Sequence, residues 1–477
     1  MNHSLHTIAR YSLIIYSLLG FILFFLGLLQ SNSILMYLSC AMMASLMPGI
    51  LIFKNKKFDP FEPLVLITFA IFFGTTARAF YVVLIDSERS RFMMYLASYD
   101  SILANMPLML SGIVFFCIGY YSTTLKIRLH KFSFLHDKFL FKKPTELIAI
   151  GCIIIGVIGC VLFINQHQID LFASLLNNSV KRSIELITSS GTSVYAAGYE
   201  VFLAKFSQYG FILCLCYLAA GYIKNSLYNK SLMTISFSLI VLIGLISSSR
   251  STILIVALNS LIILWYYGKL KLRLVLITLV SATLIATSMV TLRTKNFNPD
   301  YTGSVSILDS TLGSGNSIDF IRTSVIIDES DKKNIKLDGS SYLAFFTGFI
   351  PRQIWPEKPN VSLGPWVKTS IYGYTAKKNG YPPGMIAEAY LNFGLLGIII
   401  AMYIFGGFLK IFYLSFQPLL GNSIVATAIY GASTWRLSFS TIGLTFAQGV
   451  YQALQFCIPI LLLFIIQRYL KNNNIGS

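Results

Sequence analysis

Several positively charged residues of this chain stand in surroundings that suit the binding of an anion. Arg250 lies within the serine-rich segment Ser247–Ser251, where small side chains let a ligand approach closely. Arg352 and Lys358 lie within Pro351–Pro359, whose three prolines restrict the backbone and hold the charges in place. An arginine presents a planar fork that fits phosphate oxygens, and a lysine adds a point charge. These two segments therefore predict a phosphate-binding site.

Further ionisable residues lie in or beside strongly apolar segments. They are Arg78, Lys205, Glu388 and Arg436. A charge in the middle of a membrane-spanning helix costs about 2.5–3.5 kcal/mol on insertion scales. The presence of each of these residues in an apolar segment therefore calls for a structural or functional explanation. The three cations are candidates for the same anionic pocket, with snorkelling of single side chains to lipid headgroups as the alternative. Glu388 opens an apolar segment and is the candidate for a proton acceptor.

The composition shows what kind of molecule must position these residues. Of the 477 residues 55% are hydrophobic and only 12% are charged, whereas a soluble domain carries about 25% charged residues. A soluble enzyme, a disordered chain and a secreted disulfide scaffold are therefore excluded. The net charge of +18 fits the excess of Lys and Arg on the cytoplasmic side of membrane proteins, and nucleic acid is not expected as a partner. The sequence predicts an all-α polytopic membrane protein.

Twelve apolar segments are predicted to span the membrane. They are 11–29, 33–53, 64–85, 102–121, 147–164, 199–221, 231–247, 251–267, 272–292, 386–408, 419–433 and 448–467. Alternate connections carry 18 basic residues on one side and 6 in the short loops on the other. This bias places both termini in the cytoplasm. The chain then divides into spans one to nine (1–292), a large external loop (293–385) and spans ten to twelve with a cytoplasmic C-terminus (386–477).

The loop 293–385 is predicted to cap the outer mouth of the bundle. Apolar residues at 318, 321 and 325 have helical spacing, and the apolar run Tyr342–Ile350 is too short to span, so it predicts a re-entrant or interfacial helix. Trp355 and Trp366 follow, as is typical of a membrane–water interface. A solvated ectodomain is the alternative.

Several catalytic chemistries have no support in the sequence. The chain has five histidines, none of them in the loop 293–385, and no His and carboxylate cluster with metal-ligand spacing. It also has no glycine-rich nucleotide loop. The expected chemistry is external, independent of metals and cofactors, and carried by arginines with one carboxylate.

The motifs Ser249–Ser251, Gly348–Pro359, Pro382–Gly384 and Glu388–Gly394 together resemble the Wzy-type oligosaccharide repeat-unit polymerases of bacteria, most clearly over 339–397. The resemblance implies a fold related to the GT-C membrane glycosyltransferases. It also implies an activity at the outer face of the bacterial inner membrane. The growing O-antigen or capsule chain is transferred from undecaprenyl pyrophosphate to an incoming lipid-linked unit. A chain-length regulator and a flippase are the partners that the resemblance implies.

The resemblance also implies roles for the charged residues. Arg250 and Arg352 would grip the donor pyrophosphate and stabilise the charge that grows on it as the sugar departs, with Lys358 assisting. Arg436 and Arg78 are added to this pyrophosphate site. Glu388 would accept the proton of the acceptor hydroxyl. In the competing interpretation it pairs with Arg352 or Arg436 and orients it.

Two other functions remain open from the sequence. One is an O-antigen ligase, although such ligases rely on a histidine in the large outer loop and this loop has none. The other is a flippase of lipid-linked oligosaccharides. Transporters place polar residues near the membrane midplane and often contain inverted repeats, neither of which the sequence shows.

The predicted pyrophosphate site makes a direct prediction. Arg250→Ala and Arg352→Ala are each expected to abolish long-chain polysaccharide, because the leaving diphosphate loses a fixed cation, while lipid-linked single units are still made and flipped. A polysaccharide ladder gel measures this. Long chains of wild-type length in both variants would remove these two residues from the site.

Overall fold

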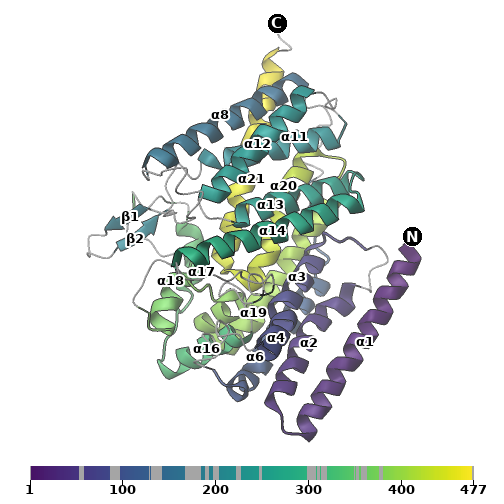
Figure 1. Ribbon diagram of the computed structural model, residues 1–477, viewed down its shortest axis with the longest axis vertical. Helices are drawn as coiled ribbons and strands as arrows, with labels where there is room; N and C mark the ends of the chain where they lie inside the picture. Colours follow the sequence, from purple (N-terminus) through teal and green to yellow (C-terminus); the bar gives the residue numbers. More distant parts are fainter. Residues whose placement is uncertain are drawn as a thin grey trace.

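The computed structural model describes most of the chain. The described residues are 2–52, 58–85, 97–127, 129, 142–166, 184–187, 193–196, 203–221, 227–246, 250–297, 308, 312, 320–348, 350, 354–355, 362–374 and 380–474. Within these ranges the chain is helical apart from one antiparallel hairpin, in which β1 (Ile184–Ile187) pairs with β2 (Ser193–Ala196). The prediction of a helical membrane protein agrees with this architecture (Figure 1).

The helices of the bundle follow the apolar segments of the sequence. They are α1 (Asn2–Leu29), α2 (Ser33–Ile52), α3 (Pro63–Ile71) continued by the π-helical η1 (Phe72–Ala77) and α4 (Arg78–Ile85), α6 (Tyr99–Ser122), α8 (Lys142–Gln166), α11 (Phe206–Ala219), α12 (Leu227–Ile246), α13 (Arg250–Tyr266), α14 (Leu272–Phe297), α19 (Gly384–Phe416), the 3-10 helix η4 (Gln417–Leu419), α20 (Ile424–Gly443) and α21 (Phe446–Asn474). Each of the twelve predicted spans overlaps one of them.

Five of the helical segments are long and apolar enough to cross a membrane. These are Tyr11–Leu29, Ser33–Ile52, Pro63–Leu84, Tyr99–Ser122 and Gly384–Leu419. The chain is therefore a membrane-embedded protein, and the full number of twelve crossings stays a prediction.

The boundaries of the predicted eleventh span, 419–433, are wrong. Ser423 caps α20 by accepting a hydrogen bond from the N–H of Ala426 (3.2 Å), so the helix begins at Ile424. It continues to Gly443, because the hydroxyls of Ser433 and Thr434 donate to carbonyls one turn back (2.6 and 2.7 Å) instead of breaking the helix. Arg436 consequently lies inside a helix and not at its outer end.

Helices α6 and α19 cross backbone to backbone. A Cβ atom at Gly119 would lie 2.0 Å from the carbonyl oxygen of Tyr403, and one at Gly406 would lie 2.1 Å from that of Phe116. Phe116 also contacts Phe405, with ring centroids 6.0 Å apart. Small residues permit this close approach in membrane proteins, where van der Waals contact drives helix association. The two glycines therefore fix the position of α19 against α6.

Helix α19 contains a sharp kink after its first turns. Phe393 (φ −143°, ψ 21°) and Gly394 (φ 62°, ψ −146°) leave helical geometry, and a residue with a side chain rarely adopts the second conformation. The carbonyl of Leu391 accepts a hydrogen bond from the backbone N–H of Leu337 in the large loop (2.8 Å). The kink thus exposes a helix carbonyl, and the loop satisfies it.

Short helices form the described part of the large loop. They are α16 (Phe320–Lys332), α17 (Ser340–Thr347), α18 (Gly364–Trp366) and the π-helical η3 (Val367–Ile371). They lie together beside the first turns of α19 (Figure 1). A helix was predicted at 318–325, and α16 confirms it. A helix was also predicted at Tyr342–Ile350, where α17 is found.

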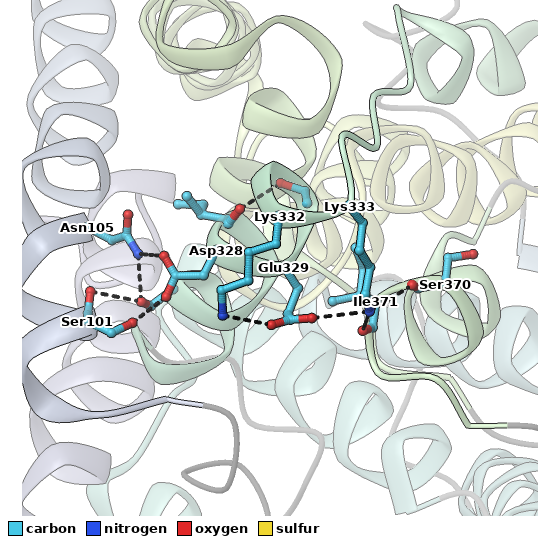
Figure 2. A network of polar contacts seen from close by, with 11 residues as sticks. Ser101, Asn105, Asp328, Glu329, Lys332, Lys333, Ser370 and Ile371 are labelled. Carbon is cyan, nitrogen blue, oxygen red and sulfur yellow. Dashed lines mark hydrogen bonds and ion pairs between the residues drawn. The ribbon is translucent and has the colours of Figure 1, made fainter.

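Helix α16 is fastened to the bundle by polar contacts (Figure 2). The amide of Asn105 on α6 donates to the carboxylate of Asp328 (2.7 Å) and to the hydroxyl of Ser324 (2.8 Å), and the hydroxyl of Ser101 donates to Asp328 as well. On α19, the hydroxyl of Tyr390 donates to Asp331 (2.8 Å). These contacts favour a loop that packs on the bundle as a cap.

One carboxylate of α16 stabilises the C-terminal end of that helix. Glu329 forms ion pairs with Lys332 (3.1 Å) and Lys333 (3.2 Å) (Figure 2). Burial alone would raise the pKa of Glu329, but the hydrogen bonds and charges of the two lysines outweigh it and hold this pKa below its usual value.

The helix crossing can be tested with small substitutions. Gly119→Ala is expected to destabilise the protein by at least about 1–3 kcal/mol, because the added methyl group overlaps the backbone of α19. The matched control is Gly151→Ala on α8, where no atom lies within 4 Å of the added Cβ. The measurement is the midpoint of thermal unfolding in detergent. Equal midpoints for the two variants would contradict the contact.

Candidate functional site

Three of the predicted site residues cannot be compared with one another. Arg352 and Lys358 lie outside the described residues, and Arg250 is the first residue of α13 with a side chain that is not described. Their convergence on one pyrophosphate therefore stays a prediction. Glu388, Arg436 and Arg78 are described.

Glu388 is fully buried in the second turn of α19. Its Oε2 accepts a hydrogen bond of 2.7 Å from the backbone N–H of Phe446, the first residue of α21. A carboxylate at a helix N-terminus satisfies an N–H that has no partner within the helix and interacts favourably with the helix dipole. Ser341 lies beside the carboxylate, but Oε1 makes no hydrogen bond of good geometry within the described chain.

Asn392, one turn after Glu388, joins α19 to the start of α17. Its Oδ1 accepts from the backbone N–H of Gly339 (2.8 Å), and its Nδ2 donates to the hydroxyl of Ser341 (2.8 Å) and the carbonyl of Glu388 (2.7 Å). All of its polar groups are thus used within the protein, which makes Asn392 a positioning residue. Sequence reasoning gave it no role, although the spacing of four residues from Glu388 places both on one helix face.

Arg436 and Lys205 are two further cations with partners other than Glu388. Arg436 is buried in α20 and donates from Nη1 to the carbonyl of Ala432 (2.6 Å). Lys205 precedes α11, is partly buried, and donates to the side chain of Gln455 on α21 (3.4 Å). The charge of Arg436 acts on Lys205. Like charges in a region of low dielectric favour the binding of an anion.

Arg436 contacts a different set of groups from those around Glu388. Tyr209 and Cys457 are among the groups near its guanidinium, and the hydroxyl of Tyr209 donates to the carbonyl of Gln455 (2.9 Å). The carboxylate of Glu388 instead faces Phe446, Ser341 and Tyr342. The proposed orienting pair of Glu388 with Arg436 therefore does not describe this arrangement.

Arg78 connects the third span to the large loop. It is buried at the start of α4, directly after the π-helical η1. Such π-turns are frequent at functional sites. Its guanidinium donates to the carbonyl oxygen of Leu312. Through this contact the backbone of the loop at Leu312 meets the Arg78 guanidinium inside the bundle.

Arg322 is a buried cation that the sequence analysis did not single out. It lies on α16 and is fully buried. Its Nη1 donates to the carbonyl of Pro382 (3.4 Å), and its guanidinium lies 5.6 Å from the ring centre of Tyr381. The only available signal was an arginine on the apolar face of a predicted amphipathic helix.

The described residues offer little to a metal ion. In this part of the chain no three or more His, Cys, Asp or Glu side chains come together in a group that could hold one. The chemistry that the described residues can supply is electrostatic, from Arg78, Lys205, Arg322 and Arg436, with proton transfer at Glu388.

Comparison of the chain with protein-family models, with curated proteins and with solved structures gives no match. The assignment of a function therefore rests on the motifs of the sequence and on the arrangement of the charged side chains.

The contact of Glu388 with α21 gives a stability prediction. Glu388→Ala removes the acceptor of the partly buried N–H of Phe446 and is expected to destabilise the protein by about 1–3 kcal/mol. Glu388→Gln keeps an oxygen acceptor of similar size and is expected to destabilise much less. The thermal unfolding midpoint in detergent is the measurement. Equal losses for both variants would show that the charge, and not the hydrogen bond, is what stabilises.

Proposed function

We propose that this protein polymerises lipid-linked oligosaccharide repeat units at the outer face of the bacterial inner membrane. It would be a metal-independent glycosyltransferase of the GT-C type with twelve spans and both termini in the cytoplasm. The observation that carries the proposal is the presence of cations among apolar helices, namely Arg436, buried within α20, and Lys205, partly buried beside Gln455 of α21.

The charge pair argues for an anionic ligand. Each cation inside a membrane helix is costly, and two near each other add mutual repulsion. A diphosphate on a polyprenyl lipid offers two adjacent negative groups at the depth of a lipid headgroup, and arginine binds phosphate oxygens with paired hydrogen bonds. Arg250, Arg352 and Lys358 would add further cations from the two basic segments, and Arg78 would lie at the same outer side.

The proposed reaction is a single glycosyl transfer. The acceptor hydroxyl oxygen forms a bond to the anomeric carbon at the end of the growing chain, and the bond from that carbon to the diphosphate oxygen breaks. The lipid diphosphate leaves with the bonding electron pair, and fixed cations stabilise its charge. Glu388 takes the hydroxyl proton; its Oε1 is buried and has no hydrogen bond of good geometry within the described chain.

The test is complementation of a strain from which the gene has been deleted. Arg436→Ala and Lys205→Ala are expected to lower chain elongation by about 10²–10³-fold, the usual effect of removing one stabilising group, so that long chains disappear. Lys332→Ala is the control, because its side chain is 65% exposed and pairs only at the surface of the cap.

The ladder gel also separates the competing functions. Loss of a polymerase leaves lipid A–core carrying a single repeat, loss of a ligase leaves bare core, and loss of a flippase keeps the lipid-linked units on the cytoplasmic side. Long chains of wild-type length in the deletion strain would overturn the proposal.

A further inference from the structure

Three tyrosines of the cap, Tyr372, Tyr374 and Tyr381, form a cluster of aromatic rings. The ring centres of Tyr372 and Tyr381 lie 5.3 Å apart, and that of Tyr374 lies 6.4 Å from each of them. Tyr372 and Tyr381 are partly buried, whereas 37% of Tyr374 is exposed. Packing within the cap explains why Tyr372 and Tyr381 are partly buried. It does not explain why the ring of Tyr374 is exposed to solvent.

Cations lie against these rings. The Nζ atom of Lys368 is 5.9 Å from the ring centre of Tyr374 and 5.8 Å from that of Tyr381. Arg322 lies 5.6 Å from the centre of Tyr381. Within the described residues Lys368 has no carboxylate partner, so its ammonium protons are available to an acceptor from outside. The cluster combines an exposed aromatic face with a donor at its edge.

The backbone around the cluster is held in place. Gly364 and Gly380 cross so closely that a Cβ at Gly380 would lie 2.5 Å from the carbonyl carbon of Gly364, and the N–H of Tyr381 donates to the Gly364 carbonyl (2.9 Å). Lys333 on α16 donates to the carbonyl of Ile371 at the end of η3 (2.5 Å) (Figure 2). The rings are therefore positioned before any ligand arrives, which reduces the entropy lost on binding.

We propose that Tyr374, with Tyr372, Tyr381 and Lys368, binds the saccharide part of the repeat unit. This inference rests on the proposed function and adds the place where the sugar chain lies. The C–H face of a pyranose ring is apolar and carries a slight positive charge, so it stacks on the negative face of an aromatic ring. Lys368 donates to hydroxyl or carboxylate oxygens at the edge of the same sugar.

The position of the cluster in the chain fits this role. Tyr381 is followed directly by Pro382, Pro383 and Gly384, and the second turn of α19 then carries Glu388. A sugar stacked on the tyrosines is thereby held by the same short, proline-stiffened segment that positions the carboxylate.

The experiment measures binding of a lipid-free ligand to the purified full-length protein in detergent. The probe is the oligosaccharide released by mild acid from the polysaccharide of the producing strain, and its affinity is measured by calorimetry. Tyr374→Ala is expected to weaken binding by about two- to tenfold, the effect of one aromatic contact, and Tyr374→Phe to retain it. Phe346→Ala is the control, because this ring is also on the cap and 71% exposed.

The results separate binding from folding. Unchanged affinity in Tyr374→Ala would overturn the inference and leave the three rings as packing alone. If that variant unfolds at lower temperature, Lys368→Met supplies the same comparison without removing a ring, because methionine has no N–H donor, and unchanged affinity there would also overturn the inference.

The inference and the proposed function can fail separately. Arg436→Ala is expected to abolish long chains and still bind the lipid-free oligosaccharide. Long chains in the deletion strain would remove the polymerase proposal whatever the binding result. Loss of oligosaccharide affinity in Phe346→Ala equal to that in Tyr374→Ala would place the sugar elsewhere on the cap.

Discussion

Helices α6 and α19 touch through their backbones at Gly119 and Gly406, and this contact fixes the distance between the two helices. On the side of the crossing nearer the cap, Asn105 of α6 binds α16. On the same side, Glu388 of α19 binds the start of α21. Because hydrocarbon offers no hydrophobic driving force between helices, packing at such small residues has to fix their distance. The cap is thus attached to α6 and the Glu388 carboxylate belongs to α19, the two helices that this contact joins.

Two other carboxylates in the bundle, Asp59 and Glu62, have both of their partners within the protein. Asp59 accepts hydrogen bonds from the hydroxyls of Tyr266 (2.7 Å) and Tyr413 (3.0 Å). Glu62 accepts from Tyr120 (2.7 Å) and forms an ion pair with Lys410 (3.2 Å). Glu388 differs because one of its oxygens has no hydrogen bond of good geometry within the described chain. Glu388 thus joins α19 to α21 with one oxygen only, whereas Asp59 and Glu62 each accept from two side chains.

The positions of the helices could be predicted because hydrophobicity along the chain decides them, and α16 followed from helical spacing. The end of α20 could not, since Thr434-Trp435-Arg436 has the composition of a membrane interface and only tertiary packing shows that Arg436 is buried. The roles of Arg322 and Asn392 depend on partners 60 and 53 residues away in the sequence. A pattern within a short stretch of sequence cannot reveal contacts between residues that far apart. The meeting of Arg250 with Arg352 is a long-range claim of the same kind and stays a prediction.

The kink at Phe393 and Gly394 has a mechanical consequence. A continuous helix resists bending because each turn is bonded to the next, whereas a break in that ladder is where a rod bends most easily. The part of α19 before the kink is bonded to the loop, because the carbonyl of Leu391 accepts from the N–H of Leu337. A displacement of the cap would therefore be taken up at this break before it reached the contact of Gly119 and Gly406.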